Sequence, residues 1–211
     1  MKYIGPFLKY FSRFPIFTAK DVRLFMQKNR ANEDYYKLFM HNLIRSGRAF
    51  KIKKGYYTLH DDIMAAGFAF SPFYYGLETA LTHYNFWDYV TPISIITTRS
   101  ARSGGRNVLE RNVNIRRISK KMFFGYSMVS HENLFYIPVA DIEKTLIDSV
   151  YFRALFNKEV YERMIDSIDI GKLERYLDHC PPIVRSRVKV LVRRYRQIPE
   201  MGMRENSKRQ R

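Results

Sequence analysis

Residues 17–59 read FTAKDVRLFMQKNRANEDYYKLFMHNLIRSGRAFKIKKGYYTL. The run 18–21, Thr-Ala-Lys-Asp, resembles a capping box with Asp in the place of the usual Glu, so it predicts the start of a short helix. A second amphipathic run covers 32–46, and Gly47 is expected to end it. Two short alternating runs flank the basic tip 53–55, as in a β-hairpin. The order helix, turn, helix and hairpin predicts a winged helix-turn-helix, which lays one helix in a DNA groove and a hairpin beside it.

The second helix of this unit is expected to bury one face and to present the other to DNA. The positions expected to face the core are Tyr36, Phe39, Met40, Leu43 and Ile44. In this fold the N-terminal half of the recognition helix reaches base edges, whereas basic residues around it meet phosphates. The candidate contacts are Asn32, Tyr35 and Lys37 for bases, Arg30, His41 and Arg45 for phosphates, and Lys51, Lys53 and Lys54 of the hairpin for phosphates or the minor groove. The alternative is a winged helix that binds protein and has a solvated basic face.

The charge distribution favours a polyanionic partner. The chain of 211 residues has a formal net charge of +17. Residues 1–60 hold 13 Lys and Arg against 3 Asp and Glu, and residues 181–211 hold 10 against 2. Because the excess sits at the two ends of the sequence, a uniform solubility bias does not explain it, and nucleic acid is the first candidate partner.

Two further basic segments form a predicted auxiliary surface. One is the loop 99–106, and the other is the exposed face of a C-terminal helix over 182–197. Their candidate residues are Arg99, Arg102, Arg106, Arg187 and Arg194. They could extend a DNA surface or meet an acidic partner, or the helix could simply have a solvated face.

The remaining pattern predicts a two-domain α+β protein. We expect a winged helix-turn-helix over 1–60, a small-residue connector over 61–70, a mixed α/β domain over 71–198, and a disordered basic tail over 199–211. The mixed domain is expected to begin with a helix at Ser71-Pro72 and to contain a small sheet. Its predicted strands are 93–98, 113–119, 126–130 and 134–137, with Pro138 closing the last, and its predicted helices are 139–152, 158–167, 170–178 and 182–197.

Several classes of function lack support in the sequence. One cysteine allows no intrachain disulfide, and the N-terminus shows no signal-peptide pattern. No apolar run approaches the ~18 residues that a membrane helix needs, so we expect a cytoplasmic protein with no membrane partner. The run 141–144, Asp-Ile-Glu-Lys, lacks the Glu-x-Lys spacing of metal-dependent nucleases. The histidines show no metal-ligand spacing with Cys180. We therefore expect no enzyme, no catalytic residue, no cofactor and no metal site.

The order of motifs in the second half resembles a known family. The segment 71–86, Ser-Pro-Phe-Tyr-Tyr-Gly-Leu-Glu-Thr-Ala-Leu-Thr-His-Tyr-Asn-Phe, is similar to a conserved segment of AbiEi-type antitoxins, the transcriptional regulators of type IV toxin–antitoxin systems. The run 123–125, Phe-Phe-Gly, and the helix carrying Glu143, Lys144 and Asp148 in Glu-Lys-x-Leu-x-Asp are similar as well. The resemblance covers about 15–180, and this chain departs from it at Asn85-Phe86, where the family has Gly.

The resemblance implies a DNA-binding repressor that controls its own operon at inverted repeats, as a homodimer or as cooperating monomers. It also implies antitoxicity against a nucleotidyltransferase toxin without a stable complex, with Glu143, Lys144 and Asp148 as a possible functional motif. A helix-stabilising network is the other role for these three residues. The alternative function is a protein-interaction module that uses its acidic second domain to neutralise a partner enzyme.

Overall fold

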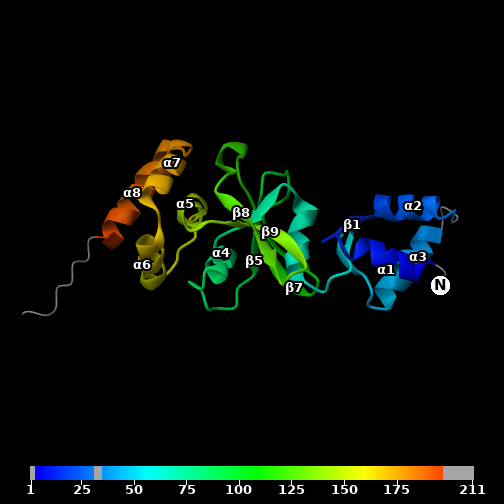
Figure 1. The fold of residues 1–211 in the computed structure, drawn as a ribbon. Helices are drawn as coiled ribbons and strands as arrows, with labels where there is room; N and C mark the ends of the chain where they lie inside the picture. The colour runs from blue at the N-terminus through cyan, green and yellow to red at the C-terminus, as the bar shows by residue number, and fades with distance from the viewer. Residues whose placement is uncertain (1–2, 31–34, 197–211) are drawn as a thin grey trace, which may run out of the picture.

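The computed structural model describes residues 3–30 and 35–196 (Figure 1). Asn32, a predicted base contact, and the predicted tail 199–211 lie outside these ranges. Within them the chain mixes helices with two β-sheets, so the predicted α+β class is confirmed.

The N-terminal part places three helices against a small antiparallel sheet. Its elements are α1 (Ile4–Phe11), β1 (Phe17–Thr18), α2 (Ala19–Lys28), α3 (Tyr35–Arg45), β2 (Phe50–Lys53) and β3 (Tyr56–Thr58). The strand order is β1-β3-β2. Phe7 of α1 is fully buried at the centre, with its ring 5.4 Å from that of Phe17 and 5.0 Å from that of Phe39. The aromatic residues of all three segments therefore form one core.

The predicted capping box at the start of α2 is confirmed. The Thr18 amide donates to the Asp21 carboxylate at 2.7 Å, and the Asp21 amide donates to the Thr18 hydroxyl at 3.2 Å. Asp can replace Glu here because its shorter side chain still reaches the backbone of the N-cap residue. These bonds satisfy two amides that lack partners within the helix.

The second part is built on a larger mixed sheet. Its strands are β4 (Phe73–Tyr75), β5 (Ile93–Thr97), β6 (Gly104–Val108), β7 (Arg111–Arg117), β8 (Tyr126–His131) and β9 (Phe135–Ala140). Its helices are η1 (Ile63–Phe70), α4 (Glu78–His83), η2 (Lys120–Met122), α5 (Ile142–Phe152), α6 (Lys158–Ser167), α7 (Ile170–Asp178) and α8 (Pro182–Arg196). The strand order is β6-β7-β5-β4-β9-β8. The predicted helices 158–167 and 170–178 are confirmed at both ends.

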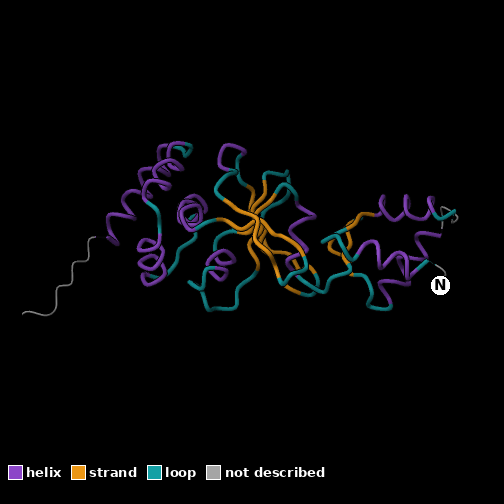
Figure 2. Tube along the Cα trace, in the orientation of Figure 1, coloured by secondary structure: helices purple, strands orange, loops and turns teal. Residues whose placement is uncertain are grey.

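The layers follow one another along the molecule. Figure 1 shows the N-terminal part at one end, the larger sheet in the middle and α6, α7 and α8 at the other end. Figure 2 shows the strands crossing at the centre, between the helical layers. Helix α3 and helix α8, each of which carries exposed basic residues, therefore lie at opposite ends of the molecule.

The segment 61–70 is not a separate connector. Ile63, Ala66 and Phe70 are buried in the same apolar cluster as the larger sheet, and Ile52 of β2 joins that cluster. The Asp62 carboxylate accepts a 2.8 Å hydrogen bond from the Met64 amide and starts η1. The small side chains of this segment permit close packing on the sheet. Their sequence pattern also fits an exposed connector, so it did not predict this packing.

The segment after Ser71-Pro72 is a strand, where we expected a helix. Phe73–Tyr75 is buried and pairs with β5 on one side and with β9 on the other. The helix α4 begins only at Glu78. Short apolar runs fit either structure by periodicity, and the pairing partners on both sides decide in favour of the strand.

Two other strands differ from expectation. Gly104–Val108, of which 104–106 were predicted to belong to the loop 99–106, pairs with β7 as the edge strand β6. Phe135–Ala140 continues through Pro138, which pairs opposite Met128 of β8. Proline has no backbone N–H and so removes one hydrogen-bond donor from the strand. The pairing of β9 with β4 is at Val139, beyond the proline, so β9 still pairs with both β4 and β8.

Candidate nucleic-acid interface

The outer face of α3 carries three of the predicted DNA contacts. Lys37, His41 and Arg45 are all exposed on this helix. Phe39, Met40 and Leu43 are buried on the opposite side, as expected. The helix therefore presents basic side chains with a helical spacing of about one turn, as a groove-binding helix requires.

Two aromatic or aliphatic positions on α3 differ from expectation. Ile44, predicted to face the core, is 38% exposed and lies beside the basic residues. Tyr35, predicted to touch bases, is half-buried, and its ring lies 6.1 Å from that of Tyr3 and 6.2 Å from that of Phe39. Tyr35 thus packs on the aromatic core, whereas Ile44 adds an apolar element to the outer face.

Helix α2 is joined to α3 through a charged aromatic contact. The Arg23 guanidinium donates to the Tyr36 hydroxyl at 2.7 Å and lies 4.6 Å from the centre of the Tyr36 ring. Arg30, a predicted phosphate contact, is exposed at the end of α2 with a φ of 56°. The contact between Arg23 and Tyr36 therefore links α2 to α3.

The hairpin β2–β3 divides its three lysines between two environments. Lys51 and Lys54 are exposed. Gly55 follows with a φ of +80°, a left-handed conformation that glycine adopts readily, and it closes the turn. Because Lys51 and Lys54 are exposed and form no salt bridge with any described residue, they can contact an external anion.

Lys53 points away from the hairpin tip and towards the larger sheet. Its ammonium donates to the Ala69 carbonyl at 2.5 Å and lies 4.4 Å from the centres of the Tyr56 and Phe70 rings. The position of Lys53 was predicted correctly within the hairpin, but its side chain is directed into the junction with η1. The cause is the Ala69 carbonyl, which η1 presents to it.

Two predicted auxiliary arginines meet Lys53 at this junction. A guanidinium nitrogen of Arg99 lies 3.4 Å from the same Ala69 carbonyl, and the Arg106 guanidinium lies 5.8 Å from the centre of the Phe70 ring. Burial, followed by the charges of Arg99 and Arg106, lowers the pKa of Lys53. We call Lys53, Arg99 and Arg106 the junction cluster. No pattern in the sequence could bring these positions together, because they lie up to 53 residues apart.

The other auxiliary residues lie elsewhere. Arg102 is exposed, and its carbonyl accepts a 2.8 Å hydrogen bond from Arg106. Arg187 and Arg194 are exposed on α8, at the end of the molecule away from α3 (Figure 1). The predicted auxiliary surface is therefore two separate surfaces, and only the one near the hairpin adjoins the N-terminal part.

The motif residues Lys144 and Asp148 are completely buried. The Lys144 ammonium pairs with the Asp148 carboxylate one helical turn away, and the Tyr74 hydroxyl donates to that carboxylate at 2.7 Å. Burial raises the pKa of Asp148, against the opposing effect of Lys144, and burial also raises the pKa of Tyr74. This network joins α5 to the central strand β4.

Glu143 turns to the other side and joins α5 to α7. Its carboxylate accepts a 2.8 Å hydrogen bond from the Asp169 amide and pairs with Lys172 at 2.9 Å. Lys172 also pairs with Asp141 at 3.0 Å, and the Tyr176 hydroxyl donates to Asp141 at 2.8 Å. Glu143, Lys144 and Asp148 therefore all have partners inside the protein. This fits the alternative role of the motif, which is to stabilise the helix.

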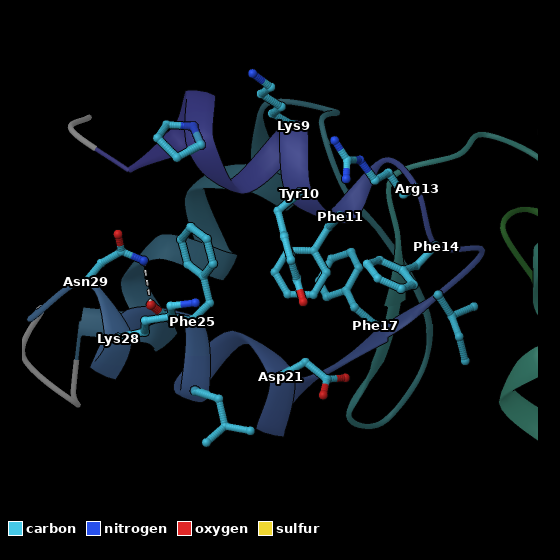
Figure 3. Close-up of a pocket in the computed structure, with 13 residues that line it drawn as sticks. Lys9, Tyr10, Phe11, Arg13, Phe14, Phe17, Asp21, Phe25, Lys28 and Asn29 are labelled. Atoms are coloured by element: carbon cyan, nitrogen blue, oxygen red, sulfur yellow. Dashed lines mark hydrogen bonds between the residues drawn. The ribbon is translucent and has the colours of Figure 1, made fainter.

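A groove on the N-terminal part lies between α1 and α2 (Figure 3). It has a volume of about 760 Å³ and is lined by Tyr10, Phe14 and Phe25, with Lys9 and Lys28 among the charged lining residues. Tyr10 is 53% exposed and Phe14 is 42% exposed. The groove is apolar with a basic rim.

One cluster in the described residues has ligand types that metals accept. A carboxylate oxygen of Asp62, a ring nitrogen of His131 and a carboxylate oxygen of Glu132 lie within 4.8 Å of one another. The sequence did not indicate this group, because Asp62 is 69 residues from His131. One Asp62 oxygen binds His131 at 2.6 Å and the other accepts from the Met64 amide, so both already have protein partners. We assign no metal to it.

Comparisons with known proteins add a likeness of fold. No protein-family model matches the sequence, and no curated protein matches it. Among solved structures, the chain is similar to the crystal structure of the RV2827C protein from Mycobacterium tuberculosis, with a TM-score of 0.61 and 14% sequence identity over 92% of this chain and 77% of that chain. No helix in the described ranges combines the length and the apolar character needed to cross a bilayer. At this identity the two proteins share a fold, and the likeness says nothing further.

Proposed function

We propose that this protein binds double-stranded DNA through an N-terminal winged helix and represses transcription. The observation that carries the proposal is the placement of Lys37, His41 and Arg45 on the exposed face of one helix that follows a short helix and precedes a basic hairpin. In this arrangement α3 enters the major groove, and the exposed Lys51 and Lys54 meet the backbone beside it.

The electrostatics of the N-terminal part support this proposal. Within residues 3–30 and 35–196, no salt bridge is formed by Lys37, Arg45, Lys51 or Lys54. Unpaired cations on one domain attract the phosphate backbone and release its counterions on binding. An interface with an acidic protein would also use such charges, so a test must ask for DNA directly.

The narrower proposal is an autoregulating antitoxin of a type IV-like toxin–antitoxin system. Its support is the resemblance of the ordered segments between 71 and 148 to AbiEi-type antitoxins. Such a repressor would occupy an inverted repeat upstream of its own gene, as a homodimer or as two cooperating monomers. Since Glu143, Lys144 and Asp148 bind within the fold, they would serve antitoxicity by holding the second domain together.

The first experiment is a gel shift with the region upstream of the protein's own gene at ~0.15 M salt, with random DNA as competitor. We expect a shift that resists the competitor and that Lys37→Ala/Lys54→Ala weakens. The matched control is Lys158→Ala/Lys189→Ala, which removes the same charge from α6 and α8. If the two double variants behave alike, the assigned surface is wrong, and if the wild type gives no shift, the function is wrong.

The second experiment addresses the antitoxin role. A nucleotidyltransferase encoded beside this gene is expressed with or without this protein, and growth is measured. We expect growth to be restored while affinity purification recovers no stable complex. A stable complex would favour the alternative, an interaction module that neutralises a partner enzyme, and continued growth arrest would contradict both roles.

A further inference from the structure

The junction cluster gathers three cations at one point of the surface, although they come from separate elements. Lys53 ends β2, Arg99 follows β5 and Arg106 lies in the edge strand β6. Lys53 and Arg99 approach the same carbonyl oxygen of Ala69, and Lys53 and Arg106 approach the same ring of Phe70. The three charges are therefore held close together by contacts to common neighbours.

No acidic side chain in the part of the chain that the structure describes pairs with these charges. Within the described ranges, none of the three residues forms a salt bridge. Their nearest acceptors are the neutral carbonyls of Ala69 and Arg102 and the faces of aromatic rings, which attract cations without neutralising them. Like charges repel at such distances, and burial adds to the effect by lowering the pKa of Lys53. A group of this kind is stabilised by an anion that contacts more than one of its members.

The geometry also limits which anion can reach the cluster. Arg99 is exposed, whereas Lys53 and Arg106 are half-buried, so the cluster opens to solvent on the Arg99 side. Guanidinium groups bind phosphate oxygens through paired N–H donors, and the lysine adds a point charge. Lys51 and Lys54, on the same hairpin as Lys53, are exposed and add positive charge to this hairpin.

We infer that the junction cluster is a phosphate-binding site that holds one backbone phosphate of the DNA bound by α3. The inference rests on the proposed function and adds a role for the second domain, since Arg99 and Arg106 belong to its sheet. The bound phosphate bridges the hairpin and the edge strand β6, so the orientation of the two parts becomes linked to DNA binding. As a phosphate contact, the site acts on every DNA sequence alike.

The test compares two double variants that remove the same charge. Arg99→Gln/Arg106→Gln changes the junction cluster, and Arg187→Gln/Arg194→Gln changes α8 at the far end of the molecule. Association constants are measured at several salt concentrations for the upstream region and for a random duplex. We expect the junction variant to lower the salt slope by about one, which weakens binding roughly five-fold at ~0.15 M salt for both duplexes. The α8 variant is expected to keep the slope of the wild type.

A second measurement reports on the site without DNA. Inorganic phosphate is expected to raise the Tm of the wild type more than chloride does at equal ionic strength, and this difference disappears in Arg99→Gln/Arg106→Gln. Equal slopes for the junction variant and the wild type would overturn the inference while leaving the proposed function intact. Equal losses in the two double variants would overturn it as well, because overall charge would then explain them. A wild type that binds no DNA overturns the inference and the proposed function together.

Discussion

The Tyr74 hydroxyl and the Asp148 carboxylate are joined by a 2.7 Å hydrogen bond in the buried layer between β4 and α5. Lys144 completes this network from one turn earlier on α5. Because all three side chains are excluded from solvent, each depends on the others for its polar partners. Lys144 and Asp148 are thus placed where they hold α5 against β4.

Asp148→Leu should be strongly destabilising, whereas adding Lys144→Met should recover most of the loss. The single change leaves a buried ammonium without its counter-ion, which costs about 3–5 kcal/mol, whereas an apolar pair of similar volume is often tolerated. In the double variant the Tyr74 hydroxyl still lacks its acceptor, so the free energy of unfolding should stay about 1 kcal/mol below that of the wild type. Urea unfolding of both variants measures the difference. A double variant less stable than the single one would contradict this account of the network.

The same pair of variants separates a structural role of the motif from a direct one. If Lys144 and Asp148 act in antitoxicity through the fold, the double variant Lys144→Met/Asp148→Leu should protect cells as the wild type does. The growth assay with the co-expressed toxin measures this. Loss of protection by a variant that unfolding shows to be stable would assign the two residues a direct role.

Gly125→Ala should destabilise the second domain by about 1–3 kcal/mol. Gly125 has a φ of +72°, and an added Cβ would lie 2.8 Å from the Cβ of Lys144 and 2.9 Å from a ring carbon of Tyr176. The control is Gly5→Ala in α1, where an added Cβ meets nothing within 4 Å. Alanine favours helices, so this control should be neutral or slightly stabilising. Thermal unfolding compares the two, and equal effects would contradict the assigned contacts.

The stability of the protein should fall between pH 10 and pH 12 partly through Tyr176. Burial, together with the hydrogen bond to Asp141, raises the pKa of Tyr176 from 10.0 to about 12. Below the unfolded value both states keep the phenol neutral, so the stabilisation is fully present. As the pH rises above 10, the Tyr176 phenol ionises first in the unfolded chain. The stabilisation therefore decreases and is lost once the pH reaches the folded pKa of about 12. The stability gap between the wild type and Tyr176→Phe should therefore shrink across this window, and parallel curves would contradict it.

The two halves of the proposed DNA surface should differ in their effect on specificity. Lys37→Ala on α3 should lower the ratio of affinities for the upstream region and for random DNA, because base contacts distinguish sequences. Lys54→Ala on the hairpin should weaken both affinities alike and reduce the salt slope by about one. Fluorescence titration with both duplexes measures the ratio. An unchanged ratio in Lys37→Ala would mean that this residue binds the backbone.

Local signals in the sequence predicted the elements whose structure depends on local contacts. The capping box at Thr18 and Asp21, and the helices α6 and α7, needed only neighbouring residues. The segment 73–75 could not be assigned in this way. Its three aromatic residues fit a helix or a strand, and hydrogen bonds to β5 and β9, supplied from elsewhere in the chain, made it a strand.

The residues of the candidate site also fall into those predicted from local sequence and those placed only by tertiary contacts. Sequence alone identified Lys37, His41 and Arg45 as one face of a helix, because helical spacing puts them there. Tertiary structure alone directed Lys53 to the Ala69 carbonyl, brought Arg99 and Arg106 to the same place, and sent Arg187 and Arg194 to the far end. The physical reason is that backbone periodicity fixes the direction of neighbouring side chains, whereas the meeting of distant charges depends on how η1 and β6 pack beside the hairpin.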